Sequence, residues 1–155
     1  MPNRESLLAG RNSQPLMDDD VRRVFNTFLG LDPALPVRYS AGSRTLFRVP
    51  AGGPEGGDCE VTFGEDIYPG KSVVDPNASL SMLAAVAHEV THFCRWKDKT
   101  ELLSADLAEI DEALTSLEAI LRFPRQLNEH DTRQLVADAI QRLQLYVHRI
   151  DRNAS

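Results

Sequence analysis

Two long segments in the second half of the chain repeat apolar residues at the spacing of a helix. In residues 104–123 the repeat, with Leu103 just before it, consists of Leu107, Ile110, Leu114, Leu117 and Leu121. In residues 131–151 it consists of Val136, Ile140, Leu143, Val147 and Ile150. Steps of three and four residues place such side chains on one helical face. We therefore predict two amphipathic helices, each with its apolar stripe in the core. The heptad-like spacing of the second stripe also permits a helical dimer.

Two further helices are predicted before these. Residues 18–29 start with three aspartates and end at Gly30, and Val21, Val24, Phe25, Phe28 and Leu29 give them an apolar face. From residue 80 the chain is rich in Ala, Leu and Met without Pro or Gly, which favours a helix that Asn77 or Ser79 would cap. Asp131 is the expected cap of the last helix.

Residues 31–70 have a different pattern, with Pro, Gly and short β-rich segments. Strands are predicted at 37–39, 45–49 and 59–63, and the Gly-rich residues 50–57 form a flexible loop in this interpretation. Residues 1–16 are polar and are expected to form a flexible arm. The prediction is thus an α+β fold in one domain, residues 17–155. A small antiparallel sheet packs on the third helix, and the C-terminal half is helical.

Composition narrows the classes of partner. At 155 residues the chain is long enough for one core, and its net charge of −6 argues against general binding to nucleic acid or to an anionic membrane. No apolar run reaches transmembrane length, and the first residues lack the apolar core of a signal peptide, so a cytoplasmic protein is expected. Cys59 and Cys94 are not spaced as a metal-binding pair and are expected to be free thiols.

The third helix carries the residues with the clearest chemistry. His88, Glu89 and His92 form the pattern H-E-x-x-H, in which the two histidines lie one turn apart on the same face. Two imidazoles at this spacing can share one zinc ion, while Glu89 is placed to act on a metal-bound water. The alternative is an ordinary amphipathic helix whose histidines occupy the polar edge of a buried face.

A zinc site of this kind needs a third protein ligand. Glu112 lies off the apolar stripe of its predicted helix, among small neighbours: Ala105, Ala108, Thr115, Ser116 and Ala119. Small side chains allow a neighbouring helix to approach closely, so a carboxylate on this face can reach a metal held by that helix. Glu109, one turn earlier, is the rival third ligand, and Glu112 is preferred.

Residues 80–123 resemble the gluzincin metallopeptidases, of which thermolysin is the familiar member, and also the small ImmA/IrrE-type peptidases. The resemblance rests on H-E-x-x-H followed by the string Asp111-Glu112-Ala113-Leu114-Thr115-Ser116. Two positions depart from the family pattern. Asp111 replaces an Asn, and Ser116 stands where an acidic residue usually supports a ligand histidine, which leaves that supporting role unassigned.

The resemblance implies a zinc-dependent peptidase with His88, His92 and Glu112 as ligands and Glu89 as general base. It also implies that an edge strand of the sheet, 59–63 or its neighbour, pairs with the backbone of an extended peptide or protein substrate. Members of the family stabilise the oxyanion with a histidine and a tyrosine. The candidates here are His130, His148, Tyr68 and Tyr146, and none is assigned.

We expect narrow specificity from a chain of this length. Two alternatives stay open: a non-catalytic zinc-binding or regulatory interaction module, and a hydrolase of non-peptide amides. The sequence does not decide between a monomer and a dimer.

Overall fold

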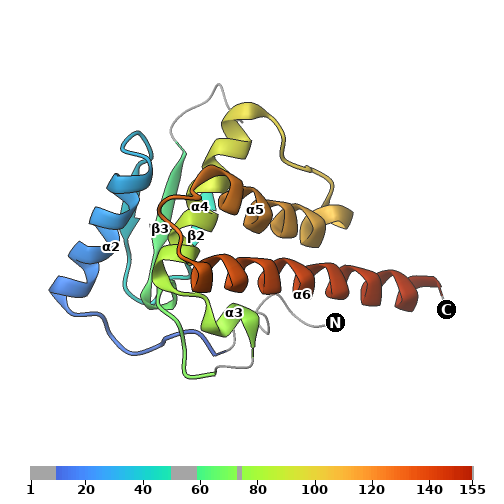
Figure 1. The fold of residues 1–155 in the computed structure, drawn as a ribbon, viewed down its shortest axis with the longest axis horizontal. Helices are drawn as coiled ribbons and strands as arrows, with labels where there is room; N and C mark the ends of the chain where they lie inside the picture. Colours follow the sequence, from blue (N-terminus) through green and yellow to red (C-terminus); the bar gives the residue numbers. More distant parts are fainter. Residues whose placement is uncertain (1–9, 50–58, 73–74, 155) are drawn as a thin grey trace.

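The computed structural model describes residues 10–49, 59–72 and 75–154 (Figure 1). The predicted loop 50–57 lies outside this part. The elements follow in the order α2 (Asp18–Leu31), β1 (Val37–Tyr39), β2 (Leu46–Arg48), β3 (Glu60–Phe63), η2 (Glu65–Ile67), α3 (Pro76–Ser79), α4 (Met82–Asp98), η3 (Ala105–Leu107), α5 (Ala108–Arg122) and α6 (Glu129–Ala154). The α+β class and the helical C-terminal half are confirmed. Within these ranges, no helix combines the length and the apolar character needed to cross a membrane.

The sheet is mixed, not antiparallel as predicted, and β3 is its central strand. β1 pairs with β3 in parallel and β2 pairs with β3 antiparallel. β1 and β2 do not pair with each other, and the segment between them is bound to η2. The Glu65 carboxylate accepts from the Gly42 N–H at 2.9 Å, and the Asp66 carboxylate accepts from the Thr45 N–H at 3.0 Å. Strand 59–63 is therefore not an edge, and β2 and β1 are the edges.

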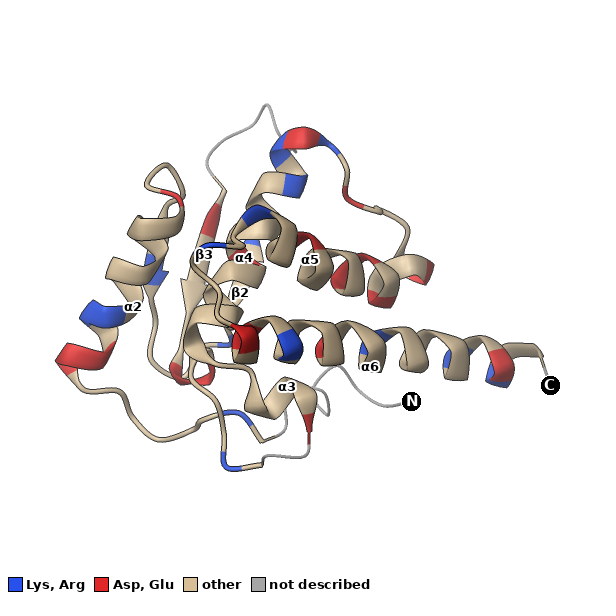
Figure 2. Cartoon of the chain, in the orientation of Figure 1, with Lys and Arg blue, Asp and Glu red and all other residues tan. Residues whose placement is uncertain are grey.

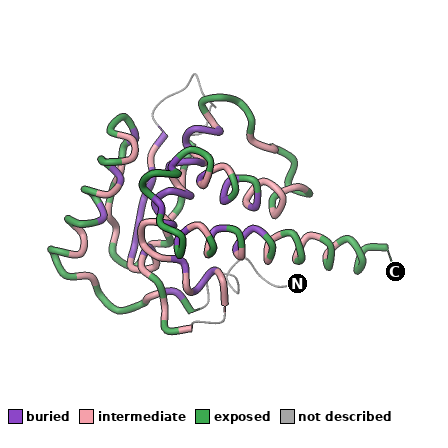
Figure 3. The backbone as a smooth tube through the Cα atoms, in the orientation of Figure 1, coloured by how far each residue is buried: buried purple, intermediate pink, exposed green. Residues whose placement is uncertain are grey.

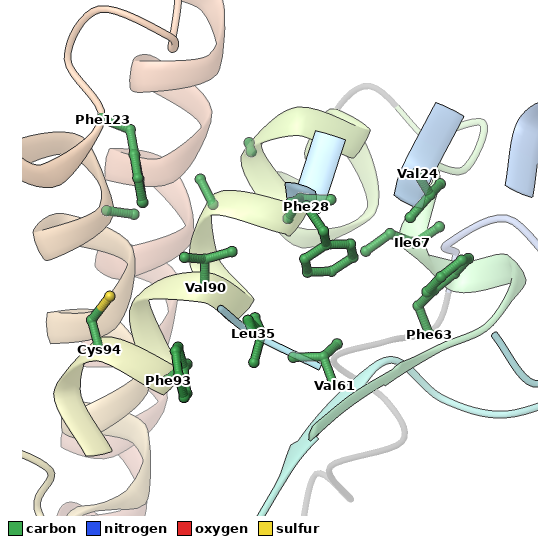
Figure 4. Close-up of a cluster of buried hydrophobic side chains, with 14 of the residues drawn as sticks. Val24, Phe28, Leu35, Val61, Phe63, Ile67, Val90, Phe93, Cys94 and Phe123 are labelled. Carbon is green, nitrogen blue, oxygen red and sulfur yellow. The ribbon is translucent and has the colours of Figure 1, made fainter. Parts of the chain in front are cut away.

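The main core lies where α2, β3 and α4 meet (Figure 4). Its members include Val24 and Phe28 from α2, Val61 and Phe63 from β3, and Val90 from α4. The predicted burial of Val24 and Phe28 is confirmed, whereas Leu29 is exposed and Phe25 is partly exposed, with its ring packed edge-on against Phe63. The core fixes α4 against the sheet, and α4 is the helix that carries the H-E-x-x-H pattern.

The helix caps differ from those predicted. Ser81 caps α4, since its hydroxyl accepts from the Ala84 N–H at 3.1 Å, while Asn77 and Ser79 lie in the separate short helix α3. Asn128, not Asp131, caps α6, because the Asn128 side chain accepts from the Asp131 N–H at 2.8 Å. The Asp131 carboxylate is then available to accept the Ser81 hydroxyl at 2.6 Å, which links the starts of α4 and α6.

The apolar stripes of α5 and α6 face outward, so the prediction that they form the core is wrong (Figure 3). Leu114, Leu117 and Leu121 of α5 are exposed, and so is the whole α6 stripe of Val136, Ile140, Leu143, Val147 and Ile150. Apart from Leu135, the buried faces consist of small or polar residues: Ala113, Thr115, Ser116 and Ala119 on α5, and Asp131, Asp138 and Ala139 on α6. Small side chains bring these helices close to each other and to α4, where large ones would hold them apart.

The predicted N-terminal arm is packed against the fold from Arg11 onward. The Arg11 guanidinium is buried and donates to the backbone oxygens of Ile67, Asn77 and Leu80 at 2.6–2.9 Å. Gly70 permits this close packing, because a Cβ atom there would lie 1.2 Å from the Gly10 oxygen. Residues 10–12 therefore brace the segments that lead into α3 and α4.

Candidate metal and catalytic site

Three donor atoms from two helices converge at one point. His88 and His92 lie one turn apart on α4, and Glu112 reaches them from α5. Oε2 of Glu112 is 2.9 Å from Nε2 of His88 and 3.0 Å from Nε2 of His92. Two imidazole nitrogens and one carboxylate oxygen at such separations form a donor set that can hold a divalent cation.

A buried hydrogen-bond chain fixes the orientation of His88. The Asp138 carboxylate of α6 is fully buried and accepts the Ser116 hydroxyl at 2.7 Å. Since the Ser116 proton is directed to Asp138, its oxygen accepts from Nδ1–H of His88 at 2.8 Å. A proton on Nδ1 leaves Nε2 available to coordinate a metal. Asp138 thus supplies, through one hydroxyl group, the support for a ligand histidine that the sequence left unassigned.

The charges of the three donors are strongly coupled. Burial alone would lower the pKa of His92, but the Glu112 carboxylate outweighs burial and raises this pKa to about 9. Burial alone would raise the pKa of Glu112, but His92 and His88 hold it well below its ordinary value. In the metal-free protein near neutral pH, His92 is therefore protonated against an ionised Glu112, and a cation that binds here displaces a proton.

Glu89 borders the same cavity and does not belong to the donor set. Burial raises the pKa of its carboxyl group, and the charges of His92 and His88 only partly offset this effect. No hydrogen bond joins its side chain to any other residue in the described ranges. A carboxylate with a raised pKa, free of partners and beside a metal site, is suited to accept a proton from water and pass it on.

Arg142 of α6 adds a positive charge to the cavity. Its Nε donates to Asp138 at 2.8 Å, and its Nη1 lies 3.7 Å from Oε2 of Glu112. The bond to Asp138 holds the guanidinium in place, and its Nη groups make no hydrogen bond within the described part of the chain. The cavity, of about 300 Å³, is lined among others by Leu46, Phe47, His88, Glu89, Glu112 and Arg142.

Several residues considered from the sequence lie elsewhere. Glu109, the rival third ligand, pairs with Arg149 at 2.8 Å, outside the His88–His92–Glu112 set. His130 and His148 are exposed, and the Tyr68 hydroxyl donates to the backbone carbonyl oxygen of Asp20. His130, His148, Tyr68 and Tyr146 are all absent from the cavity lining.

A second group of possible metal donors shares His92 with the first and adds Glu101 and Asp111. Asp111 is already engaged, because its Oδ1 accepts from Arg95 at 2.5 Å and from the Leu102 N–H at 2.9 Å. The His88–His92–Glu112 set therefore has the better-placed donors.

Sequence reasoning missed Asp138 and Arg142. Both lie on α6, four residues apart, and so share one helical face with Leu135. Because the apolar stripe of this helix was expected to face the core, a carboxylate and a guanidinium on the opposite face were expected to be exposed to solvent. One feature of the sequence did point to such a residue. Ser116 stands where the family pattern has an acidic side chain, so an acidic partner for His88 had to come from another part of the chain.

No family model matches the chain, and no match was found among the curated proteins or the solved structures.

Proposed function

We propose that this protein is a zinc-dependent peptidase that cleaves a narrow set of peptide or protein substrates in the cytoplasm. The observation that carries the proposal is the convergence of His88, His92 and Glu112, with His88 oriented by the Ser116–Asp138 chain. Two imidazoles and one carboxylate are a donor set of catalytic zinc sites, which keep one position open. Bound zinc would polarise the scissile carbonyl group and lower the pKa of a water molecule.

Two other residues of the cavity act on the substrate: one transfers the proton, and the other supplies positive charge near the carbonyl oxygen. Glu89 accepts a proton from the attacking water and delivers it to the leaving amine, which its raised pKa favours. The Nη groups of Arg142, which line the cavity beside Glu112, stabilise negative charge on the carbonyl oxygen. This role for Arg142 replaces the histidine and tyrosine considered from the sequence.

Edge strand β2 is the proposed docking site for the substrate backbone. Leu46 and Phe47 border the cavity, and among the strands of the described ranges β2 pairs only with β3. An extended peptide can add to its other side and so lie across the cavity. The hydrogen bonds from the Thr45 N–H and hydroxyl to Asp66 hold the start of this strand in position.

The test is zinc content followed by cleavage. Elemental analysis of the purified protein should give about one zinc per chain, with a sharp loss in His88→Ala and in Glu112→Ala. Glu109→Ala is the matched control and should retain zinc. The zinc-loaded protein is then incubated with a diverse peptide library, and mass spectrometry identifies cleaved bonds. Zinc binding without any cleavage would favour the non-catalytic module, and no zinc binding would exclude the site.

A further inference from the structure

The outward stripe on α6 is an apolar surface that no other part of the described chain covers. Ile140, Val147 and Ile150 are 50, 54 and 42% exposed. Five such residues from Val136 to Ile150 follow a strict four-three spacing along about 21 Å of helix. Single exposed apolar residues are ordinary on a surface, but a continuous seam at heptad spacing is the pattern of a helix that pairs with another helix.

The stripe is nearly symmetric about its middle residue. If a second α6 lies antiparallel with Leu143 opposite Leu143 of the other copy, Val136 faces Ile150 and Ile140 faces Val147. Each β-branched side chain then meets a β-branched side chain, and the two leucines meet at the centre. A twofold axis requires a surface that is complementary to itself in this way.

The charges around the stripe agree with the same register. Arg133 and Asp151 lie on one flank of the stripe, and the antiparallel arrangement brings Arg133 of one copy within a turn of Asp151 of the other. Acidic and basic residues are interspersed along α6 (Figure 2), with four acidic and four basic side chains in Glu129–Ala154. The acidic and basic side chains of α6 cancel in formal charge, although the whole chain carries −6, so a contact between two α6 helices adds no net like-charge repulsion of its own.

We propose that two copies of this chain form an antiparallel dimer through the α6 stripe, with Leu143 at the twofold axis. Successive helical residues turn by about 100°, which puts Asp138 and Arg142 on the opposite side of α6 from the stripe. The cavity stays open in the dimer, and this inference does not depend on the proposed function.

Sedimentation velocity of the full chain over a range of concentrations tests the dimer. The parent should sediment as a dimer, and the double variant Ile140→Lys/Val147→Lys as a monomer with unchanged helical circular dichroism. His148→Lys is the control, since it adds charge to α6 at an exposed position off the stripe and should leave the dimer intact. A parent that stays monomeric at all concentrations, or a dimer that survives the double variant, would overturn the proposal.

Cysteine crosslinking tests the register. Leu143→Cys alone should form an intermolecular disulfide, because residue 143 faces its own copy. Val136→Cys and Ile150→Cys should crosslink only when the two variants are mixed. Crosslinking of all three single variants would mean a parallel pair and would contradict the antiparallel arrangement. In a further check, Arg133→Glu and Asp151→Arg should each weaken the dimer, and the two together should restore it.

Discussion

The Ser116 hydroxyl of α5 lies 2.8 Å from Nδ1 of His88 on α4. This contact connects a proposed ligand to a carboxylate on a third helix, since Ser116 in turn donates to Asp138. We expect Ser116→Ala to reduce zinc affinity about 10- to 100-fold, as loss of the partner of a metal-bound histidine does. Competition with a fluorescent chelator measures the affinity.

Thr115→Val is the control for Ser116→Ala. Thr115 is equally buried, but within the described residues its hydroxyl bonds only to the backbone oxygen of Asp111 in its own helix. Zinc affinity should not change in this variant. An equal loss of affinity in both variants would mean that the effect comes from packing and not from the orientation of His88.

Glu89→Gln separates catalysis from metal binding. We expect zinc content to be unchanged and the cleavage rate to fall by about 10²- to 10⁴-fold, the usual contribution of a general base. Because burial raises the pKa of Glu89, the neutral amide should leave the metal-free protein at least as stable at pH 7. Glu118→Gln, which alters a carboxylate paired with Arg122 away from the cavity, should retain full activity. Full activity in Glu89→Gln would rule out the proposed base.

Arg142→Lys should lower kcat about 100- to 1,000-fold, as removal of an oxyanion donor does. Lysine keeps the positive charge but loses the planar group that bonds to Asp138 and presents two Nη atoms to the cavity. Zinc content should be largely retained. Arg149→Lys is the control, since Arg149 pairs with Glu109 and does not line the cavity. A change confined to KM would instead assign Arg142 to substrate binding.

The metal-free protein should be most stable in mildly acidic solution. The pKa of His92 is raised to about 9, so its stabilising effect is complete below its ordinary value near 6.5 and is lost as the pH rises through 9. The pKa of Glu112 is lowered well below its ordinary value of 4.5. The ionised carboxylate therefore stabilises the fold fully above pH 4.5, and this stabilisation is lost as the pH falls toward the lowered pKa. Urea unfolding with a chelator, at a series of pH values, measures both trends.

His92→Gln should remove most of the loss of stability between pH 6.5 and 9. The same protonation opposes metal, so zinc affinity should rise with pH up to about 9, with release of a proton on binding. Zinc affinity that stays constant between pH 6.5 and 8.5 would contradict a protonated His92.

The sequence predicted the helix of His88 and His92 and the closeness of Glu112 for a physical reason. Spacing along one helix is a local property, and small residues around Glu112 indicate close helix packing. Three of these small residues, Thr115, Ser116 and Ala119, lie on the buried face of α5, which is why its leucines face outward and their predicted burial was wrong. Asp138 and Arg142 could not be recognised, because their role depends on how α6 is rotated about its axis.

The packing of Arg11 limits how far the chain can be shortened at its start. Its guanidinium donates hydrogen bonds to the backbone oxygens of Ile67 and Asn77, on either side of residues 68–76, and of Leu80, just before α4. Proteolysis or truncation that removes Arg11 would leave those oxygens buried without a donor, below the helix that carries His88 and Glu89. Arg11 also lines the cavity, so a cut that removes this one arginine would alter both the cavity wall and the segments that lead into α4, while His88, Glu89, His92 and Glu112 stay in the chain.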